Sequence, residues 1–165
     1  MLVIRPYAED DLLACRALWR ELTQHHRDLY GDQSIGGPTP ELEFDAHIRR
    51  EDLVGFWLAE EDRRVVGMTG LLLNGDEAQI EPIVVTSERR SRGIGDALLR
   101  HARNEAIARN AHFLSLMPVA RNTRAIRKFI AAGFNIAGQI DLFEDLRPGE
   151  RTWLPDFDPG TPLRY

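Results

Sequence analysis

The residues best suited to do chemistry lie in a short basic loop, where Arg90, Gly93 and Gly95 form the pattern Arg-x-x-Gly-x-Gly. A β-branched run ends at Val85 just before the loop, and an apolar helical pattern that includes Leu98 follows it. This order predicts that the loop opens a helix, whose free N–H groups and positive dipole end favour a bound anion. Glycines there leave room for a ligand to reach the backbone. The pattern is typical of a pyrophosphate cradle.

The same loop also fits an ordinary turn with a solvated run of charges. It contains no Gly-Lys-Ser/Thr sequence of a P-loop and no third glycine of a dinucleotide fold. Its arginines, Arg89, Arg90 and Arg92, lie in a chain whose formal net charge is −5. A small positive cluster in an acidic chain favours the phosphates of a cofactor over a nucleic-acid partner.

A second motif runs from Asn122 through Ala125 and Phe129 to Gly133 and Phe134, after a short apolar strand. Asn122 is suited to cap a helix, and Gly133 is a natural residue just beyond a helix C-terminus. Ala125 is small, so a cofactor can pass close to it. Each residue alone also fits a capped amphipathic helix, but the order of the two motifs is harder to explain that way.

Together the two motifs, which span about half of the chain, resemble those of the GCN5-related N-acetyltransferase (GNAT) family. The first resembles the family's acyl-CoA loop, and the second resembles its Asn, Ala, aromatic and Gly-Phe motif. The resemblance implies acetyl-CoA as co-substrate; the spacing of possible ligands predicts no metal. The resemblance also implies cofactor contacts from Ile83, Val84, Val85, Arg90, Ser91, Arg92, Gly93, Ile94, Gly95, Asp96, Asn122 and Phe129.

Acetyl transfer to an amine needs a group that removes a proton. An alkylamine with a pKa of about 10.4 is neutral in roughly one molecule in 2,500 at pH 7, a cost of about 4.6 kcal/mol. Glu81 lies four residues before Val85 on one expected strand, which predicts the same face for both. The resemblance implies that Glu81 is the general base and that the backbone N–H of Val85 polarises the thioester carbonyl. A solvent-facing or ion-paired glutamate without a role is the alternative.

The chain departs from the family pattern at Phe129, where a tyrosine often protonates the departing thiolate. Loss of this general acid need not abolish activity. The thiol has a pKa of about 8.5, so expelling it unprotonated costs roughly 2 kcal/mol at neutral pH. Water, Ser115 or Tyr30 are the substitutes that the sequence offers.

Composition predicts an ordinary globular chain of 165 residues without a signal peptide or a run long enough to span a membrane, and hence a cytoplasmic protein. Residues 1–146 are expected to form the acyltransferase domain. The Pro- and Gly-rich tail 147–165 is expected to pack on that domain or across a homodimer. The lone Cys15 is expected to be buried rather than an acyl carrier. His25 and His26 are adjacent on a helix and so point apart, which disfavours a metal site.

The order of elements predicts an α/β (α+β) fold with a mixed, mainly antiparallel sheet and helices on both faces, in the order β-α-α-β-β-β-α-β-α-β. Helices are expected from residue 9 towards 30 and over 39–50, besides those of the two motifs. The strands are expected over 2–5, 55–60, 64–73, 78–85, 113–117 and 139–146. In the family, the strands corresponding to 82–85 and 113–117 separate, and pantetheine inserts between them.

The expected function is acetyl transfer from acetyl-CoA to a small-molecule primary amine, by direct attack in a ternary complex. Phe129 favours one alternative, a catalytically silent CoA-binding regulatory or scaffold domain. The other alternative is an enzyme that acetylates protein N-termini or lysines. No nucleic acid and no membrane is expected as a partner.

Overall fold

The computed structural model describes residues 1–138, 141–142 and 144. The chain divides into two compact units, of which the first is Met1–Met117 and the second begins at Pro118. The strand expected over 139–146 lies outside the described residues except for 141–142 and 144, and the tail 147–165 lies outside them entirely.

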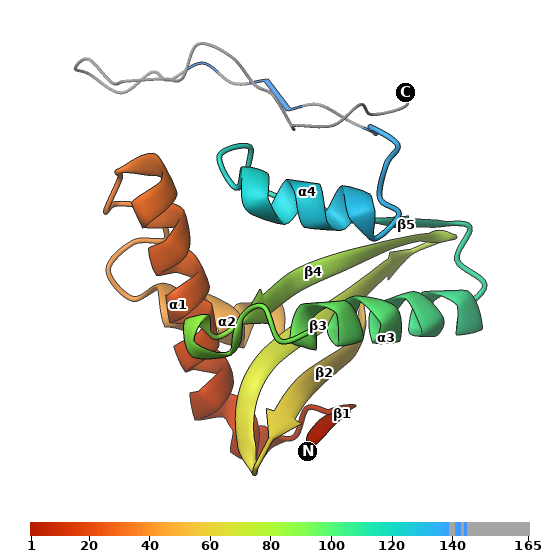
Figure 1. Cartoon of the computed structure of the whole chain (residues 1–165), viewed down its shortest axis with the longest axis horizontal. Coiled ribbons are helices and arrows are strands. Elements are labelled where there is room, and N and C mark those ends of the chain that lie inside the picture. Colours follow the sequence, from red (N-terminus) through yellow and green to blue (C-terminus); the bar gives the residue numbers. More distant parts are fainter. Residues whose placement is uncertain (139–140, 143, 145–165) are drawn as a thin grey trace. The chain divides into compact units, whose positions relative to one another are not determined.

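The first unit is built on one five-stranded sheet in the order β1-β2-β3-β4-β5 (Figure 1). The first four strands form an antiparallel meander, and β5 pairs with β4 in parallel. The predicted mixed, mainly antiparallel sheet is therefore confirmed. The strands are β1 (Leu2–Pro6), β2 (Leu53–Glu61), β3 (Arg64–Asn74), β4 (Glu77–Val85) and β5 (Phe113–Ser115).

The helices begin and end close to the predicted residues. Acidic residues open the first as a 3-10 turn, η1 (Glu9–Asp11), which leads into α1 (Leu12–Tyr30). The expected helix 39–50 is shorter, with a 3-10 turn, η2 (Pro40–Leu42), before α2 (Glu43–His47). After the meander come a third 3-10 turn, η3 (Ser87–Arg89), then α3 (Ile94–Ala108) and, in the second unit, α4 (Thr123–Ala131). None of the helices in the described residues combines the length and the apolarity that crossing a bilayer requires.

Two apolar clusters cover the two faces of the sheet and place α1 and α2 on one face and α3 on the other (Figure 1). The first cluster joins α1 and α2 to β2, β3 and β4, and its buried members are Cys15, Leu18, Phe44, Phe56, Leu58, Met68 and Val84. The second joins α3 to the other face, with Ile94 and Leu98 packed against Ala59 and Val66. Along β4, Val84 therefore faces α1, while Ile83 and Val85 face α3.

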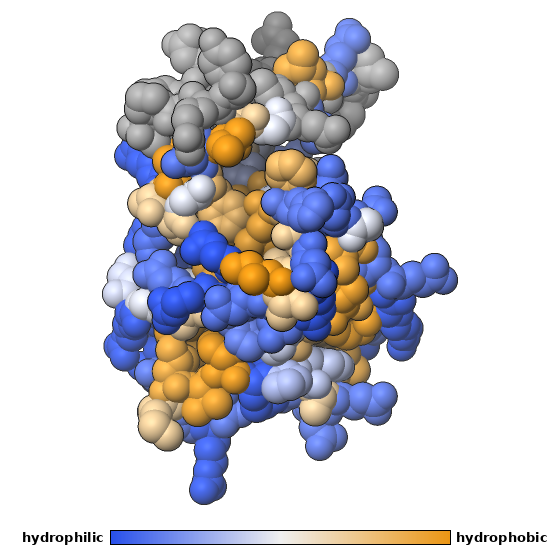
Figure 2. All heavy atoms as spheres, turned by 90° about the vertical axis from the view of Figure 1, so that its right-hand side faces the viewer, coloured by the Kyte–Doolittle hydropathy of each residue, from blue (hydrophilic) through white to orange (hydrophobic). Residues whose placement is uncertain are grey.

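Cys15 is fully buried in the first cluster, and burial raises the pKa of its thiol to about 12. The expectation that this side chain is part of the core is confirmed. The described atoms on the face in Figure 2 are mostly hydrophilic, with hydrophobic side chains in separate groups. Large exposed apolar side chains likewise come from different elements, such as Leu13 on α1, Ile107 on α3 and Phe113 on β5.

Candidate functional site

The start of α3 has the geometry of an anion cradle. Gly93 precedes the helix in the left-handed conformation, with φ of 78°, and a Cβ built on it would meet nothing within 4 Å. The N–H of Ala97 makes the first intrahelical bond, to the Gly93 carbonyl at 3.0 Å. The N–H groups of Ile94, Gly95 and Asp96 therefore have no carbonyl partner within the helix. Open space beside these donors is what a phosphate group needs.

The three arginines of this loop differ in their contacts. The Nε of Arg89 lies 3.4 Å from Glu61 at the end of β2. Arg90 donates from Nε to the carbonyl of Val85 at 3.0 Å, and its Nη2 lies 3.6 Å from Glu21 of α1. Arg92 is exposed, and no ion pair involves it among the described residues. Two arginines thus anchor the loop, and Arg92 is the charge best placed to meet a ligand.

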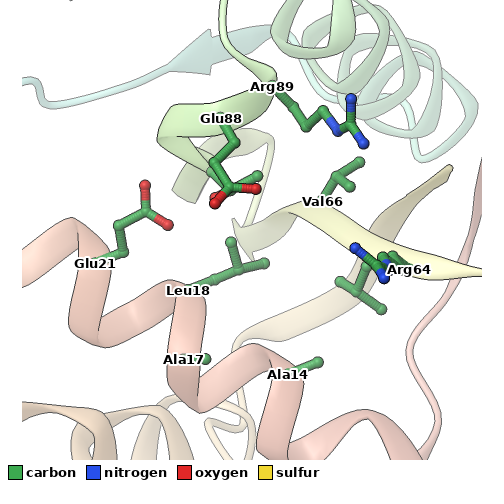
Figure 3. A pocket seen from close by; sticks show the side chains of 10 residues that line it. Ala14, Ala17, Leu18, Glu21, Arg64, Val66, Glu88 and Arg89 are labelled. Atoms are coloured by element: carbon green, nitrogen blue, oxygen red, sulfur yellow. The ribbon is translucent and has the colours of Figure 1, made fainter.

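A pocket of about 220 Å³ lies beside the loop, between α1, the start of β3 and η3 (Figure 3). Its lining combines the small side chains of Ala14 and Ala17 on α1 with the apolar side chains of Leu18 and Val66. Its lining contains neither the cradle residues nor Glu81, so the sequence-predicted site lies outside this pocket.

Strands β4 and β5 separate where the family resemblance predicts. They pair only from Glu77 opposite Phe113 to Gln79 opposite Ser115. From residue 81 to 85, β4 has a partner only in β3 among the described strands. The strand expected over 113–117 ends earlier, at Ser115, which widens the separation.

The register also fixes where the backbone groups of β4 point. The N–H of Thr86 donates to the carbonyl of Val66 at 2.9 Å, and Gly67 lies opposite Val85. Because hydrogen-bonded and non-hydrogen-bonded pairs alternate in an antiparallel ladder, Val85 belongs to a non-bonded pair. Its N–H, and that of Ile83 two residues earlier, therefore point away from β3 and towards the opened edge. This is the geometry that the predicted carbonyl donor requires.

The prediction that Glu81 and Val85 share a face is wrong. Thr69 pairs with Ile83 but Leu71 pairs with Ile80, so β4 contains one residue more than β3 over this interval. A bulge of one residue reverses the alternation of side chains. Val85 consequently packs on the α3 face, whereas the Glu81 side chain lies beside residues that belong to α2 and the segment after it.

The bulge depends on a glycine in the neighbouring strand. A Cβ on Gly70 would lie 2.3 Å from the carbonyl oxygen of Glu81, a distance that no packing adjustment of a side chain can relieve. Gly70 thus lets the backbone of β4 approach β3 at this point.

The Glu81 carboxylate is both reachable and partnered. Its Oε1 lies 3.4 Å from Nη1 of Arg50 and 3.7 Å from Nδ1 of His47, and its Oε2 accepts a hydrogen bond from Gln79 at 2.8 Å. The side chain is 35 % exposed. Arg50 also donates to both carboxylate oxygens of Asp52, at 2.9 and 2.7 Å, and so is shared between two acids. Glu81 therefore combines an ion pair with an exposed face that can meet an amine.

Sequence reasoning missed His47. Its Nε2 lies 3.0 Å from the Glu81 carbonyl oxygen, and the residue is only 5 % exposed. Burial lowers the pKa of this imidazole. No spacing in the sequence links residues 47 and 81, since only the bulge turns Glu81 towards α2.

In the second unit, the second motif forms the predicted capped helix. The Asn122 side chain accepts a hydrogen bond from the N–H of Ala125 at 3.2 Å. At the other end Gly133 has φ of 105°, and the N–H groups of Gly133 and Phe134 bond to the carbonyls of Ile130 and Phe129, each at 3.0 Å. These two backbone hydrogen bonds together form the Schellman motif. The cap roles of Asn122 and Gly133 are confirmed, and cofactor contact by Asn122 and Phe129 stays a prediction.

Of the suggested substitutes for the missing tyrosine, Ser115 is already engaged. Its hydroxyl donates to the carbonyl of Ala78 at 3.3 Å. In the described part of the chain, no group of three His, Cys, Asp or Glu side chains is arranged to hold a metal ion.

Comparison with known proteins tests the family resemblance and the fold. The profile of the acetyltransferase (GNAT) family matches residues 16–134. Among curated proteins, none matches the sequence. The ribosomal-protein-S18-alanine N-acetyltransferase of Escherichia coli has 24 % identity and a TM-score of 0.66, covering 84 % of this chain and 80 % of that one.

Two further solved structures have the same fold. A GNAT-family acetyltransferase of Staphylococcus aureus Mu50 has 18 % identity and a TM-score of 0.68, covering 92 % of this chain and 95 % of that one. The aminoglycoside acetyltransferase AAC(6')-Iy, solved with a CoA bisubstrate analogue, has 16 % identity and a TM-score of 0.64, covering 88 % and 98 %. The motifs, the fold and the match over residues 16–134 lead to one conclusion: the chain belongs to the GNAT family of acetyltransferases.

Proposed function

We propose that this acetyltransferase moves the acetyl group of acetyl-CoA to a primary amine of a small molecule, by direct attack in a ternary complex. The observation that carries the proposal is the continuity of one binding track. The opened edge of β4, with the N–H of Val85 turned outwards, lies close to the free N–H groups at the start of α3, since a Cβ on Gly95 would lie 3.9 Å from Cγ2 of Val85. The edge suits pantetheine and the thioester carbonyl, and the helix start suits the pyrophosphate.

The residues divide the reaction as follows. Glu81 takes a proton from the ammonium group, and the freed nitrogen lone pair attacks the thioester carbonyl carbon. The N–H of Val85 stabilises the negative charge that develops on the carbonyl oxygen, a contribution of around 3 kcal/mol for one pre-organised donor. The carbon–sulfur bond then breaks and CoA leaves as the thiolate, while the second proton of the attacking nitrogen passes to the thiolate or to water and a neutral amide remains. Cys15 takes no part, because its buried thiol has a raised pKa.

Two of the similar proteins support transfer to nitrogen, and the first of them also supports direct attack. AAC(6')-Iy was solved with the analogue CoA-S-monomethyl-acetylneamine, in which CoA and acceptor are joined in one molecule. The Escherichia coli enzyme is named for the alanine of a ribosomal protein. Small-molecule and protein acceptors both occur on this fold, and the test therefore includes both.

The proposal is tested with purified full-length protein, acetyl-CoA and a panel of acceptors. The panel contains small polyamines, amino sugars, amino acids and lysine- or alanine-ended peptides. CoA release and the mass of the acetylated product are measured, with acceptor-free samples as the control. We expect turnover with at least one small amine. Turnover with peptides alone would overturn the small-molecule acceptor, and CoA binding by calorimetry without any turnover would identify a silent binding domain.

Replacing Phe129 by tyrosine tests the missing acid. If thiolate departure limits the rate, Phe129→Tyr should raise kcat by at most roughly thirtyfold, equivalent to about 2 kcal/mol. If water already protonates the thiolate, kcat should hardly change. Steady-state kinetics with the best acceptor of the panel measure this. A strong loss of activity would mean that the phenylalanine is needed for apolar packing, which contradicts its interpretation as a tolerated replacement.

A further inference from the structure

Both ring nitrogens of His47 face Glu81, and one of them is within hydrogen-bond distance of it. The imidazole lies beneath the indole of Trp19, with ring centroids 5.1 Å apart, and beside Phe56 at 6.2 Å. Nε2 lies 3.0 Å from the backbone carbonyl oxygen of Glu81, and Nδ1 lies 3.7 Å from the carboxylate oxygen Oε1 of the same residue. One buried side chain thus contacts the backbone and faces the side chain of the expected base.

These contacts determine the tautomer. A carbonyl oxygen only accepts hydrogen bonds, so Nε2 must carry a hydrogen and donate it. In the neutral ring Nδ1 is then the unprotonated nitrogen, with its lone pair directed towards the Glu81 carboxylate. A distance of 3.7 Å is too long for a hydrogen bond, but an approach of about 1 Å would bring the two atoms into bonding range.

The charges around His47 favour a ring that is neutral yet able to accept a proton. Burial lowers its pKa, and the positive charge of Arg50 lowers it further. The carboxylates of Glu81 and Asp52 act in the opposite direction and raise it. The imidazolium would therefore be formed beside two acids, one of which is the expected base.

We propose that His47 is a positioning residue that also receives the reaction proton from Glu81, so that the two side chains act as one proton-accepting pair. This rests on the proposed function, in which Glu81 is the base. The N–H bond of the acceptor ammonium breaks, its electron pair stays on nitrogen, and the proton moves to a carboxylate oxygen of Glu81. That O–H bond then breaks as the Nδ1–H bond forms, which leaves a carboxylate and an imidazolium.

The pair is a better proton acceptor than a carboxylate alone. A general base works best when its pKa lies near the working pH, and a carboxylate is a weak base for an amine of pKa about 10.4. When the proton passes to the imidazole, Glu81 becomes a carboxylate again and lies beside the positive charge of the new imidazolium. The proton can later return to water through the exposed part of Glu81.

The test separates the proton role from packing. In His47→Gln the side-chain amide can still donate to the Glu81 carbonyl, but it cannot accept a proton. We expect kcat/KM to fall about tenfold or more near pH 6.5, and the loss to shrink towards pH 9, where more of the amine is already neutral. The control is His101→Gln. His101 also packs against a tryptophan, with its ring centroid 4.8 Å from that of Trp57, but it belongs to α3 on the other face of the sheet. This variant should leave the pH profile unchanged.

Two further measurements use the same proteins. In the double variant E81Q/H47Q the rate should equal that of E81Q alone, since His47 acts through Glu81. Imidazole ¹⁵N NMR of the full-length protein, with no acceptor present, should report the neutral Nε2–H tautomer of His47 at pH 7. Its pKa should fall further in E81Q, because the carboxylate that raises it is gone.

The outcomes distinguish the inference from the proposed function. A slow E81Q with an H47Q that matches wild type at every pH would overturn the role of His47 and leave Glu81 as the base. An E81Q as fast as wild type would overturn both. An Nδ1–H tautomer at pH 7 would overturn the proton transfer, because Nδ1 would then have no free lone pair.

Discussion

Glu81→Gln should lower kcat by about a hundredfold or more at pH 7 while acetyl-CoA binds as before, because general bases typically contribute factors of this size. Glutamine keeps the length of the side chain and an oxygen that can accept from Gln79, so the site should keep its shape. The loss should shrink as the pH rises, since bulk water removes more of the ammonium proton. Rates measured from pH 6 to 9 with the best acceptor check this.

A matched control for this variant is Glu60→Gln. Glu60 lies on β2 and pairs with Arg5 at 2.7 Å, so this change also removes a carboxylate from a partly exposed arginine pair. It should affect neither rate nor cofactor affinity. A rate for Glu81→Gln that matches wild type across the whole pH range would remove Glu81 from the mechanism.

Gly93→Val should weaken acetyl-CoA binding by more than tenfold while the protein still folds. A β-branched side chain at the start of α3 would fill the open space beside the N–H groups of Ile94 and Gly95. It would also be strained at φ of 78°, at a cost of about 1–2 kcal/mol in stability. Calorimetric titration with acetyl-CoA and a thermal melt separate the two effects.

Gly75→Val provides the matched control for strain. Gly75 lies in the turn between β3 and β4, has φ of 63°, and likewise has nothing within 4 Å of a Cβ. Both variants should therefore lose a similar amount of stability, but only Gly93→Val should lose affinity. Equal Kd values for the two variants would contradict the pyrophosphate cradle.

The sequence predicts the parts of the site that depend on local signals. The glycine loop before α3 and the caps of α4 at Asn122 and Gly133 follow from residue types within one turn of a helix, and the structure contains them. The antiparallel meander follows from alternating apolar residues and turn signals between successive strands. Such features need no knowledge of distant residues.

The parts that the sequence does not predict all depend on contacts between distant segments. The bulge in β4 requires a glycine in β3, so the orientation of Glu81 cannot be derived from its spacing to Val85. His47 becomes part of the site only through that reversed orientation. Likewise, the ion pair of Arg89 with Glu61 depends on the end of β2, and it offsets part of the positive charge of the loop.

The two glycines of β3 that face carbonyls of β4 mean that β4 takes its shape from β3. A Cβ at Gly67 would lie 2.9 Å from the Val84 carbonyl oxygen, just as one at Gly70 would meet that of Glu81. Grafting residues 81–95 into another sheet would therefore transfer the functional groups without their arrangement. A successful transplant must therefore carry both strands, β3 together with β4.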